Sequence, residues 1–397
     1  MDATTEHHEP GAAAQPRGAL PFLTVAQRDG LQPQLREVIE YRKSGLSVNW
    51  IVGCPLDCGY CVRHLFGNFE MKQPRALTSE SHAAQMLLSH PAFRAHSTPI
   101  QLLNRATDPM LPRVKPHLLQ MLRLLDEQGL TNHVLVITRW RIHAEDCAIL
   151  NSFTNLRLTV LVTHSGIDDN RIEPVDSTIA VETLRTAFIH ADRYRVILYW
   201  RPIVPGLNDS DAHIDTALTL SDYAHGTVFT GLFFKDEIRD YYRAHGLPEP
   251  YRDSARRKVF PENLEQRILT AAVERQLRSP LFRKTSCAVA YAHQRADYNG
   301  HYGIRELCDI CPAAQIARCA SAWRRPDEQK AAALAEDLGG KLVEITERAV
   351  IVRGLDEQRR YLMQHQFGYQ IHDERTPHHP HRHGRADLGW PSIKETL

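Results

Sequence analysis

Short apolar stretches rich in β-branched residues recur up to about residue 235 and predict the strands of a parallel sheet. They do not alternate with polar residues, which is typical of strands covered on both faces. The six stretches are residues 47–54, 99–104, 133–139, 156–163, 194–204 and 226–234. Helical patterns separate most of them, at about 79–90, 114–128, 178–191 and 209–224. This alternation predicts an α/β fold, a partial parallel (β/α)6 barrel over residues 21–235.

The pattern changes after residue 235, where polar helices are interrupted by prolines. We therefore predict a helical, cysteine-rich region at 236–324. Signals for a helix, a β-hairpin and a second helix then predict a small α+β appendage at 325–370. Residues 1–20 have the composition of a flexible leader, and residues 371–397 form a His-rich tail. We expect the histidines of this tail to be solvated rather than metal-bound: His378, His379, His381 and His383.

Composition and charge limit the classes of protein that fit. The chain has 397 residues, 43% of them hydrophobic, with a formal net charge of +1, so no global charge attracts nucleic acid. No apolar run approaches the roughly 18 residues of a membrane-spanning helix. The N-terminus lacks the basic start and apolar core of a signal peptide. We therefore expect a cytoplasmic protein with reduced cysteines and no membrane partner.

Three cysteines lie close together in "GCPLDCGYC", where Cys54, Cys58 and Cys61 have C-x3-C-x2-C spacing just after the first predicted strand. In barrels of this kind the chemistry gathers at the C-terminal ends of the strands, which is where this motif would lie. A [4Fe–4S] cluster has four irons that thiolates usually bind, so three thiols would leave one iron open to another molecule. The alternative is a zinc site with His64, in "CVRH", as fourth ligand.

The motif, with Tyr60 before its third cysteine, resembles the cluster motif of radical S-adenosylmethionine (radical SAM) enzymes. That resemblance implies that the open iron binds the amino and carboxylate groups of SAM. An electron from the cluster would then cleave SAM to methionine and a 5′-deoxyadenosyl radical, which abstracts hydrogen from a substrate. It also implies an electron donor such as a flavodoxin or ferredoxin.

Further motifs at the strand ends resemble the branch of this superfamily that includes spore photoproduct lyase. They are "TDP", "ITR", "RIEP" and "PIVPGLND" after the second to fifth predicted strands. The Gly-Gly-Glu segment of many members is replaced by "LLNRATDP". The resemblance implies contacts to SAM from Tyr60, Asn104, Thr107, Thr138, Ser165 and Arg201, with Asp108 as a further polar candidate. Arg201 could instead belong to a plain Pro-Gly turn, and Ser165 to a plain loop. Arg171 and Glu173 could position SAM or substrate, but we favour a structural role in which they pair with each other on the rim.

A second group of cysteines has C-x20-C-x2-C-x7-C spacing: Cys287, Cys308, Cys311 and Cys319. Four thiols make a closed metal site, for which a second [4Fe–4S] cluster and zinc compete. We predict that these sulfurs converge within about 7 Å, the span of a cubane cluster with its thiolates. If Cys287 does not join them, the missing ligand should come from residues 293–302. Cys147 stands alone and is predicted to be a buried, inert thiol.

Three classes of function therefore compete. The first is a radical SAM enzyme that acts on a nucleotide or nucleic acid, a peptide or a small metabolite. The second is an electron-transfer or scaffold protein with two clusters and no turnover. The third is a zinc-dependent nucleic-acid-binding module. The polar motifs at the strand ends favour the enzyme, and the nearly neutral charge disfavours the nucleic-acid module.

Overall fold

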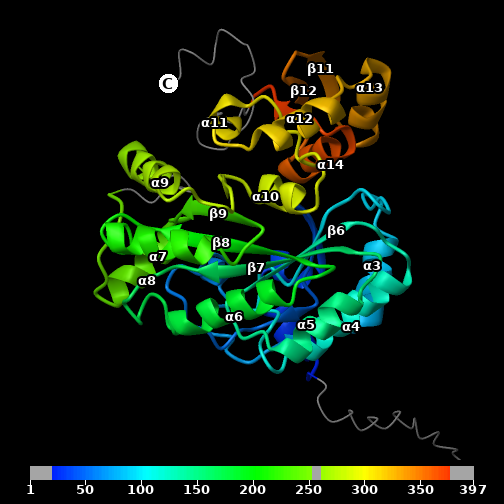
Figure 1. Ribbon diagram of the computed structural model, residues 1–397. Helices are drawn as coiled ribbons and strands as arrows, with labels where there is room; N and C mark the ends of the chain where they lie inside the picture. The colour runs from blue at the N-terminus through cyan, green and yellow to red at the C-terminus, as the bar shows by residue number, and fades with distance from the viewer. Residues whose placement is uncertain (1–19, 253–260, 376–397) are drawn as a thin grey trace, which may run out of the picture.

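The computed structural model describes residues 20–252 and 261–375. Its centre is an eight-stranded sheet in the order β1-β2-β5-β6-β7-β8-β9-β10, and every pair except antiparallel β1 and β2 is parallel. The strands are β1 (Ile39–Arg42), β2 (Gly45–Val48), β5 (Ile100–Leu102), β6 (His133–Thr138), β7 (Arg157–His164), β8 (Arg195–Ile203), β9 (Gly226–Gly231) and β10 (Leu281–Phe282). The predicted α/β class with a mostly parallel sheet is confirmed (Figure 1).

Helices alternate with the parallel strands and cover the outer face of the sheet. They are α3 (Glu80–Leu88), α4 (Lys115–Glu127), α5 (Ala144–Ser152), α6 (Ser177–Ile189) and α7 (Asp211–Ser221). In Figure 1, α4, α5 and α6 lie below the sheet, whereas α10 (Thr285–Ala292) lies above it. Val196 and Leu198 of β8 belong to the main core, while Ile197 and Tyr199 pack with α10. Both faces of the strands are buried, which explains why the apolar runs do not alternate.

The first predicted strand, residues 47–54, is divided in the structure. Its beginning belongs to β2, and its end forms β3 (Ile51–Val52), which pairs antiparallel with β4 (Arg75–Ala76) in a separate two-stranded sheet. Asn49 turns the chain between them, with its backbone N–H bonded to the carbonyl of Val38 at 2.8 Å. The cysteine motif therefore follows β3 rather than a strand of the central sheet. The two edge strands β1 and β10 are additional to the six predicted strands.

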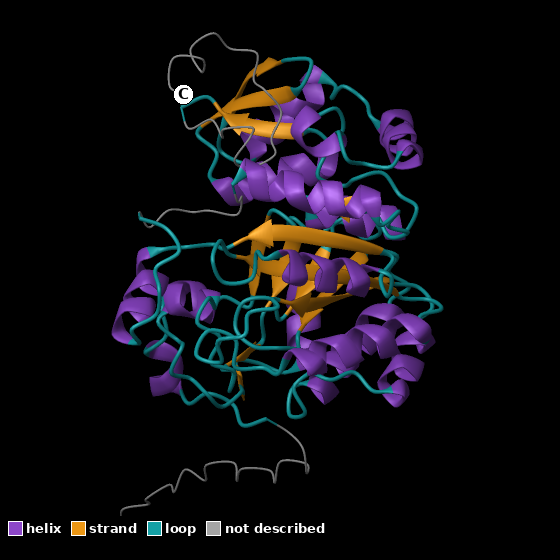
Figure 2. Cartoon of the chain, turned by 60° about the vertical axis from the view of Figure 1, so that its left-hand side comes forward, coloured by secondary structure: helices purple, strands orange, loops and turns teal. Residues whose placement is uncertain are grey.

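The C-terminal appendage has the predicted helix, hairpin and helix, and a further strand. It consists of α13 (Glu328–Asp337), β11 (Lys341–Ile345), β12 (Ala349–Arg353), α14 (Glu357–Phe367) and β13 (Gln370–Asp373). Strand β13 pairs parallel with β12, so the appendage extends past the predicted limit at residue 370 into the predicted tail. Figure 2 shows this small sheet separated from the central sheet by helices. The leader up to residue 19 and the four tail histidines lie outside the described residues.

The remaining short elements connect these parts. They are α1 (Val25–Asp29), α2 (Pro33–Arg36), the 3-10 helix η1 (Val62–Phe66), α8 (Asp236–Ala244), α9 (Glu262–Glu274), α11 (Arg305–Cys308) and α12 (Ala313–Ala322). The appendage is tied to the first hairpin, because the hydroxyl of Tyr41 on β1 and Nδ1 of His365 on α14 lie 2.8 Å apart. Within the described part of the chain, no helix has the length and apolar character needed to cross a membrane.

Candidate functional site

The three N-terminal cysteines lie on the loop that leaves β3. Gly53 begins this loop with φ of +96°, and a Cβ atom there would lie 2.3 Å from the carbonyl oxygen of Gln73. Only glycine fits this close backbone approach without displacement. Cys54 and Cys58 are buried, Cys61 is half-buried, and all three are free thiols. The loop thus presents three possible thiolate ligands from one short segment.

The arrangement of these thiols does not match a single zinc ion. Thiolates around tetrahedral zinc lie about 3.8 Å apart, given Zn–S bonds of about 2.3 Å. Among the described residues, Cys54, Cys58 and Cys61 do not form a group whose ligand atoms all lie within 4.8 Å of one another, with or without His64. The ring of His64 stacks on Phe69 instead, with centroids 3.8 Å apart, and burial lowers its pKa to about 4. The wider spacing of the sulfurs disfavours the zinc alternative.

Two arginines place positive charge beside the buried thiols. The side chain of Arg63 is almost fully buried and donates a 2.9 Å hydrogen bond to the carbonyl of Phe69, which holds it inside the loop. Burial raises the pKa of Cys54 and of Cys58, while Arg63 and Arg139 respectively act in the opposite direction. A bound cation would stabilise the thiolates further, so metal binding here would release protons.

A buried polar network holds Tyr60 next to the cysteines. Its hydroxyl donates to Oε2 of Glu173 and accepts from Nη1 of Arg139. Nη1 of Arg139 lies 3.0 Å from the same carboxylate oxygen, and the Ser165 hydroxyl donates to that oxygen at 2.9 Å. The side chains of Arg139 and Glu173 are only 16% and 7% exposed, so this is an internal ion pair. Tyr60 is therefore fixed by a residue at the end of β6 and by one from the loop between β7 and α6.

One expectation about the segment after β7 needs correction. Arg171 does not pair with Glu173 but with Asp169, at 2.5 Å on the surface, because Glu173 turns inward to Arg139. Ser165 is buried and bonded to Glu173, and it is not among the residues that line the cavity described below. The amide of Asn208 also donates to the carbonyl of Ser165 at 2.5 Å, which ties this strand end to the turn after β8.

The carboxylate of Asp108 organises the ends of β5 and β6. It accepts hydrogen bonds from the hydroxyl of Thr138 at 2.7 Å and from the backbone N–H of Arg139 at 2.8 Å. The backbone N–H of Met110 donates to it at 2.9 Å. Burial raises the pKa of Asp108, and these three hydrogen bonds oppose the shift. The hydroxyl of Thr138 is thus already used inside the protein, while its side chain still borders the cavity.

Polar side chains near the C-terminal ends of β5 and β7 lie in the same region. The side-chain amide of Asn104 accepts from Ser47 and donates to Gln101, each at 2.5 Å. The hydroxyls of Thr107 and Thr163 are buried and have no hydrogen-bond partner within the described ranges. A buried hydroxyl without a partner is costly, so these two groups are available to a bound molecule.

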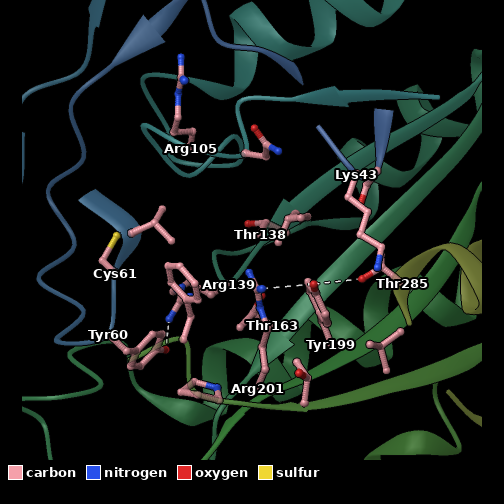
Figure 3. A pocket seen from close by; sticks show the side chains of 18 of the residues that line it. Lys43, Tyr60, Cys61, Arg105, Thr138, Arg139, Thr163, Tyr199, Arg201 and Thr285 are labelled. Atoms are coloured by element: carbon pink, nitrogen blue, oxygen red, sulfur yellow. Dashed lines mark hydrogen bonds between the residues drawn. The ribbon is translucent and has the colours of Figure 1, made fainter. Parts of the chain in front are cut away.

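These side chains surround one cavity with a volume of about 300 Å³. It runs from the cysteine loop along the inner face of the sheet to the start of α10, and Figure 3 shows part of its lining. It brings together most of the residues singled out from the sequence: Cys54, Cys58, Tyr60, Cys61, Asn104, Thr107, Asp108, Thr138 and Arg201. Further lining residues that sequence reasoning did not single out include Lys43, Arg139, Thr163, Tyr199, Thr285 and His301.

Arg201 lies deeper in the cavity, on β8. Its guanidinium lies 4.0 Å from the centre of the Tyr199 ring, and Nη1 donates to the Tyr199 hydroxyl at 3.2 Å. That hydroxyl is also 3.1 Å from the hydroxyl of Thr285 at the start of α10 (Figure 3). Residues two apart on a strand share a face, so once Arg201 is a candidate, Tyr199 could have been found from the sequence.

The four C-terminal cysteines surround the loop between α10 and α11. The Sγ atom of Cys308 lies 3.6 Å from the carbonyl oxygen of His301, and Cys319 accepts from the backbone N–H of Asp297 at 3.4 Å. Cys287 lies with its Sγ atom 3.8 Å from Nδ1 of His301. Burial raises the pKa of Cys287 well above its usual value, and Asp297 and the other three thiols raise it further. Cys311 follows α11 directly, and burial raises its pKa to about 12.

The eighth cysteine, Cys147 on α5, is fully buried, as predicted. Its thiol is 3.9 Å from the carbonyl of Thr186 on α6. Burial raises its pKa, which is consistent with an unreactive thiol.

Comparison with known proteins gives distant structural likeness. No family model matches the chain, and no curated protein sequence matches it. Spore photoproduct lyase complexed with dinucleoside spore photoproduct matches at 12% identity with a TM-score of 0.46, over 67% of this chain and 86% of the other. SuiB from Streptococcus suis bound to S-adenosylmethionine matches at 9% identity with a TM-score of 0.40, over 65% of this chain and 54% of the other.

Proposed function

We propose that the protein is a radical SAM enzyme, with a [4Fe–4S] cluster held by Cys54, Cys58 and Cys61. The observation that carries the proposal is the position of these three free thiols, which lie together on one loop at the end of a cavity along the inner face of a parallel sheet. With SAM at its open iron, such a cluster supplies the electron that produces a 5′-deoxyadenosyl radical. The three sulfurs are not all within 4.8 Å of one another, which suits a cluster better than a single ion.

The cavity residues fit a polar cofactor of this kind. The unpartnered hydroxyls of Thr107 and Thr163 can bond to a ligand without breaking an internal hydrogen bond. Arg201 forms no ion pair with a carboxylate among the described residues, so its charge is available to an anionic group. We therefore propose Tyr60, Asn104, Thr107, Thr138 and Arg201 as the SAM-binding side chains. Ser165 would act indirectly, by orienting Glu173.

The protein's own residues would position the reactants and limit access of water. Tyr60 is held rigidly by Arg139 and Glu173, so it can form a fixed wall beside the cysteines. Asp108 fixes the backbone of Arg139 and the side chain of Thr138, which sets the shape of the cavity between β5 and β6. A flavodoxin or ferredoxin is the proposed electron donor. The substrate could be a nucleotide or nucleic acid, a peptide or a small metabolite.

We extend the proposal to a second metal centre at the C-terminal cysteines, with a [4Fe–4S] cluster or zinc as its occupant. An electron-transfer or scaffold protein without turnover has no need of a polar cavity beside the first cysteines, which favours the enzyme.

Iron counting tests the first site. After anaerobic reconstitution with iron and sulfide, changing Cys54, Cys58 and Cys61 together to Ala should remove about four irons per chain. Cys147→Ala is the matched control, because that thiol stands alone in the sequence and is buried on α5 beside the carbonyl of Thr186, and it should retain the full iron content. An unchanged iron content in the triple variant would show that the first cysteine group does not hold a cluster.

A further inference from the structure

Asp297 and His301 lie in the loop between α10 and α11, in the middle of the second cysteine group. Their side chains are only 3% and 1% exposed. Nδ1 of His301 lies 3.0 Å from Oδ2 of Asp297 and 3.8 Å from Sγ of Cys287. One ligand atom from each of these three residues can be chosen so that all lie within 4.8 Å of one another. In the described part of the chain, no other group of three or more His, Cys, Asp or Glu side chains meets this criterion.

These distances suit a single metal ion. Bonds of about 2.0–2.3 Å in tetrahedral geometry separate neighbouring ligand atoms by about 3.3–3.8 Å. The three side chains approach this spacing in the folded chain, whereas no three of the four C-terminal thiols lie mutually within 4.8 Å. The arrangement already formed that suits a single ion is therefore one thiol, one carboxylate and one imidazole.

Two buried polar atoms in this group have no partner among the described residues. They are Oδ1 of Asp297 and Nε2 of His301. The other carboxylate oxygen, Oδ2, is occupied, because it accepts from the backbone N–H groups of Asn299 at 3.1 Å and His301 at 3.0 Å. Leaving buried polar atoms unsatisfied costs free energy, and a metal ion bound nearby would remove part of that cost.

The charges around Asp297 also indicate that a cation could bind here. Among the described residues, the only ion-pair partner of Asp297 is His301, which is positive only when protonated. The carboxylate is surrounded by thiols, because Cys287 is close to His301 and Cys319 accepts from the backbone N–H of Asp297. A buried carboxylate near several potential thiolates needs a compensating cation.

The appendage holds this loop in place from outside. Gly300 has φ of +65°, and a Cβ atom there would lie 2.5 Å from the backbone of Gly368, so the loop and appendage are in direct backbone contact. The side chain of Gln370 on β13 donates to the carbonyl of Asn299 at 2.6 Å. Nε2 of His365 on α14 lies 2.6 Å from Oδ1 of Asn299. Ligands held by rigid neighbours are pre-organised for a metal.

We infer that Cys287, Asp297 and His301 bind a single divalent transition-metal ion, Zn²⁺ or Fe²⁺. Thiolate, imidazole and carboxylate together are donors that both ions accept. The ligand set differs from one made of thiols alone, because Cys308, Cys311 and Cys319 do not belong to the group whose ligand atoms lie within 4.8 Å of one another. His301 and its neighbour Ser286 line the same cavity as the first cysteine loop, so the ion would lie near the cavity wall opposite that loop.

The inference goes beyond the proposed SAM chemistry, because it uses none of the residues of the first cysteine loop. Its test uses the full chain with Cys54, Cys58 and Cys61 changed to Ala, so that failure of the SAM proposal cannot affect the result. This parent protein is loaded with Zn²⁺ and, separately and without oxygen, with Fe²⁺. X-ray absorption should show a mixed shell of sulfur at about 2.3 Å and nitrogen or oxygen at about 2.0–2.1 Å for zinc.

Variants of the same parent then assign the ligands. Cys287→Ser, Asp297→Asn and His301→Gln should each weaken Zn²⁺ binding at least tenfold, since loss of an outer-shell partner alone costs about 10–100-fold. His293→Gln is the matched control, because this half-buried histidine contacts the hydroxyl of Thr159 at 2.9 Å, and binding should be unchanged. Circular dichroism identifies any variant that has lost its fold.

Three results would overturn the inference. One is a shell of sulfur alone around the metal in the parent protein, which requires no variant and so cannot be confused with misfolding. Another is equal binding in the control and in folded Asp297→Asn and His301→Gln proteins. The third is binding of four irons with four sulfides in the parent, which would replace the single ion with a cluster.

Discussion

The ion pair between Arg139 and Glu173 provides a direct test of how the first site is held together. Replacing Glu173 with Gln keeps the shape of the side chain and an acceptor for Tyr60 and Ser165, but it removes the negative charge. Nη1 of Arg139 lies 3.0 Å from Oε2 of Glu173, and the two side chains are 16% and 7% exposed. At this distance the attraction is about 5 kcal/mol if the effective dielectric constant is about 20.

The variant would leave Arg139 largely buried without its counter-charge, and breaking such a pair typically costs about 3–5 kcal/mol. We expect this loss in the free energy of unfolding, measured by guanidinium chloride titration with tryptophan fluorescence. Glu182→Gln is the matched control. This change breaks the 2.7 Å ion pair between Glu182 and Arg141, whose side chains are 63% and 45% exposed. It should lower the free energy of unfolding by no more than about 1 kcal/mol. If the two variants differ by less than about 1 kcal/mol, Glu173 does not compensate the charge of Arg139.

Three further predictions concern the appendage and the cavity. Gly300→Ala should cost more than about 2 kcal/mol of stability, because left-handed strain of about 1–2 kcal/mol is joined by a 2.5 Å clash with the backbone of Gly368. Gly246 has φ of +60° with open space around it, so Gly246→Ala should lose only the stability that corresponds to the left-handed strain, measured in the same denaturation assay. Burial lowers the pKa of His365 to about 4, so between pH about 6.5 and 4 the unfolded chain binds a proton that the folded chain does not. Stability should therefore fall as the pH falls through this window, and His365→Gln should flatten the fall; an equal slope in both proteins would exclude His365 as the cause. Arg201→Gln should raise the KM for SAM at least tenfold while leaving the melting temperature within a few degrees, and an unchanged KM would remove Arg201 from the binding site.

The apolar pattern was sufficient to predict the order of strands and helices, because parallel strands covered on both faces have a distinctive composition. Very short elements were missed for a physical reason. Strand β10 has two residues, and β13 has four in the sequence "QIHD", so neither carries enough pattern to be recognised. Their pairing depends on neighbouring strands that are distant in the sequence. The division of residues 47–54 into β2 and β3 likewise depends on contacts of Asn49 with the chain before it.

The sequence likewise predicted some residues of the candidate site and missed others. Spacing alone identified the thiols, because ligands on one loop are close in sequence. The partners of Tyr60 could not be found in this way, since Arg139 comes from the end of β6 and Glu173 from the loop between β7 and α6. Asp297 and His301 lie inside the gap between the first two C-terminal cysteines. The sequence indicated residues 293–302 as the source of a missing ligand, but it did not single out these two residues, because ligand-type residues four positions apart are too common to identify a site without coordinates.

The central claim is that the first cysteine loop supports cleavage of SAM. The most direct test incubates the reconstituted, reduced protein with SAM without oxygen and measures 5′-deoxyadenosine by mass spectrometry. We expect product from the unaltered protein and from Cys147→Ala, and none from the variant in which Cys54, Cys58 and Cys61 are all Ala. If the triple variant still forms 5′-deoxyadenosine at the rate of the unaltered protein, the proposed function is wrong.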